Sequence, residues 1–175
     1  MRSVLVVMLL VVCASTQESG PVEASCGPKG TSFDIKLDKS QHPLATPEPG
    51  KARVYFVQDT GGELECFTGA SCLTTRIGID GAWVGANHHN SYFSASVEPG
   101  EHHICANWQS HVSDLNRVVA FAHFSAEEGK IYFFRTRPFG TQGNFEVQLD
   151  IDPLDSDQAK HLITHYPLSE SHPKR

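Results

Sequence analysis

Residues 75–85 read TRIGIDGAWVG and carry the strongest local structural signal of the chain. Asp80-Gly81 lies between two short apolar runs. A two-residue hairpin turn needs positive φ at both central positions, and Asp-Gly adopts these angles more readily than most dipeptides. The stretch therefore predicts two antiparallel strands joined by a tight turn.

Strand-like segments continue on both sides of this turn. Apolar and polar side chains alternate over 33–38 and 145–151, which is the pattern of a strand with one buried face. Residues 53–58 are β-branched and aromatic and too few for a helix, so they predict a core strand.

Two more hairpins are expected where proline or glycine marks a turn. Pro99-Gly100 suits the two central positions of a turn, and Gly129 closes a second turn after two glutamates. The strand pairs expected at these turns are 91–97 with 102–108, and 118–124 with 130–136.

One helix is expected near the C-terminus, over residues 153–166. Asp152 is a good N-cap, Pro153 fits the first helical position and Pro167 ends the helix. Residues 168–175 after it are expected to form a disordered tail.

These elements predict an all-β fold, an antiparallel β-sandwich of seven to eight strands in the Ig-like manner, with one C-terminal α-helix. The single sandwich domain is expected to span 32–167. A flexible N-terminal arm over 16–31 precedes it.

The composition narrows the class of protein. The chain has 175 residues, of which 39% are hydrophobic and 19% charged, with 14 glycines and 10 prolines. These values exclude a coiled coil, a collagen-like repeat and a polytopic membrane protein. The net charge of −6 argues against nucleic-acid binding, because neutralising phosphates requires clustered lysines and arginines.

The N-terminus predicts export. Arg2 is followed by an unbroken apolar run over 4–12, which is long enough for the core of a signal peptide and too short to span a bilayer. We expect a signal peptide over 1–15, and no transmembrane segment in the mature chain. Two forms of export remain open, a soluble periplasmic protein and a lipid anchor through Cys13, for which Val12 is a poor preceding residue.

The remaining cysteines fit an oxidising compartment. Cys26, Cys66, Cys72 and Cys105 are an even set that predicts two disulfides. The short, small-residue segment between Cys66 and Cys72 favours a local bridge, which leaves Cys26 with Cys105. Four cysteines allow three pairings, however, and a zinc site is the rival interpretation, although it lacks a close C-x-x-C pair.

Four motifs between residues 51 and 151 carry a family resemblance. They cover residues 79–85, 91–93, 97–102 and 129–133. Together they resemble bacterial domain-of-unknown-function family 2846, and the Pro-Gly-x-His turn is similar to PEGA-type envelope modules. The resemblance implies an exported, PEGA-like β-sandwich and no catalytic residues. The cysteines lie outside these motifs.

The histidines are the main candidates for chemistry. The chain has ten, and two pairs are adjacent, His88-His89 and His102-His103. A shared metal site is disfavoured, because the expected hairpin separates the pairs by roughly 30 Å and neighbouring strand residues point to opposite faces. Neither a G-x-S-x-G nor an H-E-x-x-H motif occurs.

Aromatic and basic side chains suggest binding instead. Trp83 and Trp108 are candidate partner-binding residues, with burial in the sandwich core as the alternative. Arg135 and Arg137 either bind an anion or form a solvated strand end.

The expected function is that of an exported cell-envelope module without catalysis or a cofactor, whose partner is an unknown envelope protein or glycan. The alternative is a histidine-based metal-binding protein or hydrolase in the periplasm.

Overall fold

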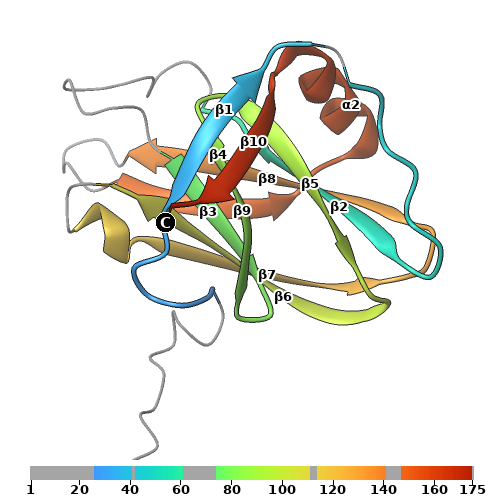
Figure 1. Ribbon diagram of the computed structural model, residues 1–175, viewed down its shortest axis with the longest axis horizontal. Helices are drawn as coiled ribbons and strands as arrows, with labels where there is room; N and C mark the ends of the chain where they lie inside the picture. Colours follow the sequence, from blue (N-terminus) through green and yellow to red (C-terminus); the bar gives the residue numbers. More distant parts are fainter. Residues whose placement is uncertain (1–25, 41, 61–73, 111–113, 141–146, 175) are drawn as a thin grey trace, which may run out of the picture.

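The computed structural model describes residues 26–40, 42–60, 74–110, 114–140 and 147–174 (Figure 1). Most of these residues lie in two sheets that share one core. The six-stranded sheet has the order β1-β10-β5-β2-β8-β9 and the four-stranded sheet the order β4-β3-β6-β7. The mainly β, two-sheet architecture confirms the predicted sandwich class at this level.

The strand bounds follow the order of the sheets. The six-stranded sheet contains β1 (Phe33–Asp38), β2 (Ala52–Gln58), β5 (Ser91–Val97), β8 (Ile131–Gly140), β9 (Val147–Pro153) and β10 (Leu168–Pro173). The four-stranded sheet contains β3 (Thr74–Ile79), β4 (Ala82–His88), β6 (Gly100–Gln109) and β7 (Val119–Ala126). A 3-10 turn, η1 (Leu115–Arg117), precedes β7, and the α-helix α2 (Ser156–His165) connects β9 to β10.

The hairpin predicted from residues 75–85 is confirmed. β3 and β4 pair antiparallel, and Asp80 and Gly81 between them have φ angles of 50° and 79°. The pairing register shifts between Ile77 and Gly78, so the hairpin contains a β-bulge.

The other two predicted hairpins are wrong. β5 joins the six-stranded sheet and β6 the four-stranded sheet, and β7 and β8 are divided in the same way. Both turns therefore carry the chain from one sheet to the other. A turn sequence predicts that the chain reverses, but long-range burial decides which strand each arm then pairs with.

The six-stranded sheet also differs from an antiparallel sheet. β2 runs parallel to β8, and β10 parallel to β5, while the other neighbouring strands pair antiparallel. The chain reaches these parallel positions because it leaves the sheet between the paired strands, through the four-stranded sheet or through α2.

The core lies between the sheets. Alternate side chains of β2, β3 and β6, among them Phe56, Ile77 and Trp108, are fully buried there. The opposite face of β2 presents Tyr55 and Val57 to a second cluster, which Ala159 and Ile163 of α2 complete. The helix therefore covers the second face of the six-stranded sheet.

The helix begins later than the sequence predicts. Pro153 is the last residue of β9, and α2 begins at Ser156. Asp155, not Asp152, is the N-cap, and its carboxylate accepts hydrogen bonds from the backbone N–H of Asp157 and Gln158 at 2.9 and 3.2 Å. Both aspartates suit the position, and continued pairing of β9 with β8 excludes the earlier one.

The predicted disordered tail is also wrong. Leu168–Pro173 forms β10, which pairs along its whole length with β1. Ser169, only 4% exposed, donates a hydrogen bond to the carbonyl of Ala86 in the other sheet at 2.7 Å. The strand lies between β1 and β5 and contributes little apolar surface. Its polar sequence therefore lacks the pattern from which a strand is predicted.

Among the residues that the structure describes, no helix has the length and apolar character needed to cross a membrane.

Candidate functional site

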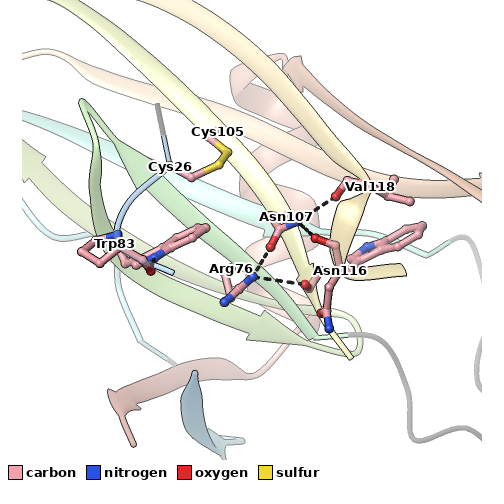
Figure 2. The surroundings of a disulfide bond; sticks show 9 residues. Cys26, Arg76, Trp83, Cys105, Asn107, Asn116 and Val118 are labelled. Carbon is pink, nitrogen blue, oxygen red and sulfur yellow. Dashed lines mark hydrogen bonds between the residues drawn. A yellow bond between two sulfur atoms is a disulfide. The ribbon is translucent and has the colours of Figure 1, made fainter. Parts of the chain in front are cut away.

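A disulfide between Cys26 and Cys105 fixes the start of the described chain to the middle of β6 (Figure 2). The two Cα atoms are 4.9 Å apart, and both residues are fully buried. This confirms one of the two predicted bridges, whereas Cys66 and Cys72 lie outside the described residues. From Cys26 onward, the expected flexible arm is instead held against the four-stranded sheet.

Two glycines allow this close approach. Gly78, at the bulge in β3, lies directly beneath the backbone of Cys26, and a Cβ there would overlap the Cys26 carbonyl. Gly27 has a φ of 144°, and a Cβ there would clash with the ring of Trp83. The segment 26–32 therefore packs on the sheet with backbone against backbone and backbone against indole.

A cleft of about 480 Å³ lies between segment 26–32 and the face of the four-stranded sheet that points away from the core. Arg76 and Asn107 reach this face because they alternate with the core residues Ile77 and Ala106 along β3 and β6. The volume lies within the range of small-molecule sites.

Arg76 is the central side chain of the cleft. Its guanidinium lies 4.6 Å from the centroid of the Trp83 ring, which is a cation–π distance. It donates a hydrogen bond to Oδ1 of Asn107 (Figure 2). It also donates to the Thr31 carbonyl and, at 3.4 Å, to the Trp108 carbonyl. Arg76 therefore connects segment 26–32 to both β3 and β6.

The amide of Asn107 is itself fixed. Its Nδ2 donates to the carbonyls of Asn116 and Val118 at 2.8 and 2.9 Å. Asn116 in turn exchanges two hydrogen bonds with the backbone of Ser110, at 2.8 and 2.6 Å. The wall of the cleft is thus a connected hydrogen-bond network, which holds Arg76 in one place.

The charged side chains that line the cleft are all basic. Lys29, Arg76 and Arg117 line it, and no aspartate or glutamate is among the described residues that form its wall. Burial lowers the pKa of Arg76, although a guanidinium stays protonated at any pH of interest. A cleft of this kind attracts negative charge.

The two tryptophans have different positions. Trp83 borders the cleft, is partly buried, and donates from Nε1 to the Pro28 carbonyl at 2.9 Å. Trp108 is 0% exposed and lies in the core between the sheets, so the prediction that it contacts a partner is wrong. Trp83 stays a candidate for ligand contact.

The four candidate metal-binding histidines do not come together. His88 pairs with Thr74, which lies opposite Gln109, so the His88-His89 pair is about 23 Å along the sheet from His102. Across the described residues, no group of three or more histidine, cysteine or acidic side chains is placed to hold a metal.

The adjacent imidazoles of His88 and His89 are 4.2 Å apart, as centroids. Nδ1 of His88 is 2.9 Å from the Thr74 hydroxyl, and burial, followed by the charge of His89, lowers the pKa of His88. A similar pair outside the predicted candidates, His161 and His165, lies on α2 with ring centroids 4.4 Å apart. Each pair offers two ligands, where structural zinc sites use four and catalytic sites three.

His102 connects two turns. Its Nδ1 is 2.6 Å from a carboxylate oxygen of Asp80, and its Nε2 is 2.7 Å from the Glu98 carbonyl. Both partners are acceptors, so the arrangement suits the doubly protonated ring. Burial acts to lower the pKa of His102, but the hydrogen bonds to Asp80 and Glu98 outweigh it and the pKa is raised.

Stability at this site should therefore depend on pH. Because the folded-state pKa of His102 is above its unfolded value of about 6.5, the ring stabilises the fold fully below that pH and progressively less as pH rises through the folded pKa. We expect His102→Gln to destabilise the protein more at pH 5.5 than at pH 8.5. Urea unfolding of both proteins at the two pH values measures this, and an equal or larger loss at pH 8.5 would contradict it.

One serine, histidine and aspartate do lie together, in the loop after β1. Ser40 Oγ is 2.7 Å from Asp38 Oδ1 and 3.1 Å from His42 Nε2, and the same His42 nitrogen is 3.0 Å from Asp38 Oδ2. The hydrogen bonds from Ser40, followed by His42, hold the pKa of Asp38 at about 2. A hydrolytic triad uses separate ring nitrogens for the carboxylate and the nucleophile, so this cluster fits a closed turn better than an activated serine.

Comparisons with known proteins add one relative. No family model matches the chain, and no solved structure matches it. A Haemophilus influenzae protein described as "Uncharacterized protein" is 25% identical over 127 residues, which are 73% of this chain and 66% of that protein. The chain thus spans slightly less than two thirds of that relative's length.

Proposed function

We propose that the protein is an exported, non-catalytic binding module of the cell envelope, and that its ligand occupies the cleft between segment 26–32 and the four-stranded sheet. The observation that carries the proposal is Arg76, which is stacked on Trp83 and held by Asn107 at the centre of a cleft of ligand size. A rigid aromatic next to a fixed polar donor is a common means of binding and orienting a small ligand.

Export is supported by the signal-like N-terminus and by the Cys26–Cys105 disulfide, since disulfides persist mainly in oxidising compartments. Whether the mature protein is soluble or anchored through Cys13 does not alter the proposed site. The finer assignment, a PEGA-like module similar to family 2846, is supported by the Asp80-Gly81 hairpin and the turn at Pro99-Gly100.

The proposed partner is an envelope protein or glycan rather than nucleic acid. The net charge of −6 disfavours binding of a long polyanion such as nucleic acid across the surface of the protein. The cleft nevertheless brings three basic side chains together at one place. The size of the cleft favours a short part of such a partner, for example one sugar unit or one peptide terminus.

Binding is tested with the mature exported protein and a set of small envelope components, neutral disaccharides and peptidoglycan peptides. We expect at least one class to shift the amide NMR signals of segment 26–32 and of Trp83. Trp83→Ala should weaken that binding at least tenfold, and Val84→Ala, at an exposed neighbouring position, should leave it within twofold. Shifts that map to another surface, or equal binding by Trp83→Ala, would contradict the proposal.

A further inference from the structure

Arg76 differs from the other arginines in the part of the chain that the structure describes. Four of the five face a carboxylate, at 3.0 to 3.8 Å: Arg53 with Glu48, Arg117 with Asp114, Arg135 with Asp59, and Arg137 with Asp152. For Arg76, every hydrogen-bond acceptor is a neutral oxygen, from Thr31, Asn107 and Trp108. Its positive charge therefore lacks the compensation that the other four have.

This arrangement is costly without an anion. A partly buried cation loses hydration, and neutral carbonyl oxygens compensate for only part of that loss. The pKa of Arg76 shows the same imbalance, because burial lowers it and no neighbouring carboxylate opposes the shift. Lys29 and Arg117 at the rim of the same cleft add positive charge, part of which Asp114 offsets at 3.8 Å from Arg117.

The guanidinium is also prepared for a ligand. Of its five N–H groups, three have acceptors in Thr31, Asn107 and Trp108, and Nε is closed off from solvent. The second N–H of Nη1 remains as a donor in a side chain that lines the cleft. The Trp83 ring and the Asn107 network already restrict the Arg76 side chain, so binding of a ligand costs little further side-chain entropy.

We propose that the cleft selects ligands that carry a carboxylate or phosphate group, with Arg76 as the contact residue and Lys29 and Arg117 as long-range attraction. The inference rests on the proposed function and names the chemical class of its ligand. An arginine donor suits the planar carboxylate and the phosphate better than the point charge of lysine does. A carboxylate would come from a peptide terminus or an acidic sugar, and a phosphate from a phosphorylated envelope polymer or free phosphate.

The first experiment compares matched small probes on the mature protein by amide NMR and Trp83 fluorescence. N-acetylglycine and N-acetylglycinamide differ only in the charged group, and inorganic phosphate tests the other anion. We expect N-acetylglycine or phosphate to shift the signals of segment 26–32 and to bind at least tenfold more tightly than the amide. The anion that binds more tightly indicates the source of the natural ligand.

The second experiment uses variants. Arg76→Gln should weaken anion binding at least tenfold and Arg76→Lys less, while Arg137→Gln, a surface control, should stay within twofold. Because Arg76 also holds Thr31, its loss could unfold the segment. The double variant Lys29→Gln/Arg117→Gln therefore serves as a second test, since both residues are exposed. It should lower the affinity severalfold and flatten its dependence on salt.

The outcomes separate the two proposals. Anion binding that survives Arg76→Gln in a folded protein, or an amide that binds as well as its acid, overturns the anion assignment and leaves a binding module. An Arg76→Gln variant that unfolds, together with a double variant that binds anions as the wild type does, also overturns the assignment and leaves Arg76 as a structural clamp. If neither charged nor neutral probes perturb the cleft, both proposals fail.

Discussion

Replacement of Cys26 and Cys105 together by serine is expected to lower the free energy of unfolding by about 4 to 5 kcal/mol. The bond closes a loop with a sequence separation of 79, and a long loop loses much entropy in the unfolded chain when it is crosslinked. Small domains have only about 5 to 15 kcal/mol of stability in total, so this bond accounts for roughly a third of it or more.

Urea unfolding of the oxidised wild type and the double variant measures the difference. Each single replacement, Cys26→Ser or Cys105→Ser, should cost about as much as the double, because either one removes the same bond. If the loss in the double variant equals the sum of the two single losses, or is below about 1 kcal/mol, the crosslink does not stabilise the fold by restricting the entropy of the unfolded chain.

Truncation of Trp108 to alanine is expected to cost about 3 to 5 kcal/mol, the typical loss for a large buried aromatic. The side chain is 0% exposed and fills the space between the sheets beside Phe56 and Ile77. Trp83→Ala should cost less, about 1 to 2 kcal/mol, because it removes the contact with Arg76 and the hydrogen bond to the Pro28 carbonyl at a partly exposed position.

Thermal or urea unfolding of the two alanine variants compares them directly. Trp108→Phe provides a milder control, since the indole Nε1 of Trp108 has no hydrogen-bond partner among the described residues and its removal leaves no unpaired acceptor. If Trp83→Ala were the more destabilising of the two alanine variants, the assignment of Trp108 to the core and Trp83 to the cleft would be wrong.

Local chemistry predicted the local parts of the fold. Asp80-Gly81 specifies its own turn, and the hairpin forms as expected. Pro99-Gly100 specifies a reversal equally well, but the partners of β5 and β6 lie in different sheets. Which strands meet depends on the burial of segments that are far apart in the sequence, and turn chemistry contains no information about that.

The predictions of the helix start and of a disordered tail were wrong for a related reason. Asp152-Pro153 satisfies the rules for the start of a helix, yet the pairing of β9 with β8 extends through Pro153. The segment 168–173 lacks the apolar alternation of a typical strand, and it becomes one because β1 pairs with it along its whole length, while β5 pairs with it at Leu168.

The site was harder to predict than the fold. Arg76 looks like an ordinary solvent-facing residue of an alternating strand, and its environment is created by Thr31 and Cys26, which lie about 50 residues away. One signal did exist in the sequence. Gly78 is an isolated glycine inside a strand pattern, and such a glycine often marks the close approach of another segment of backbone.

The pairing of β1 with β10 also has a consequence for the order of folding. β1 lies at the edge of its sheet, and the residues that it pairs with in β10 come 130 to 140 positions later in the sequence. Closing so long a loop costs chain entropy before any contact offsets it, and contacts of this kind form slowly. This edge is therefore expected to be among the last parts of the six-stranded sheet to assemble.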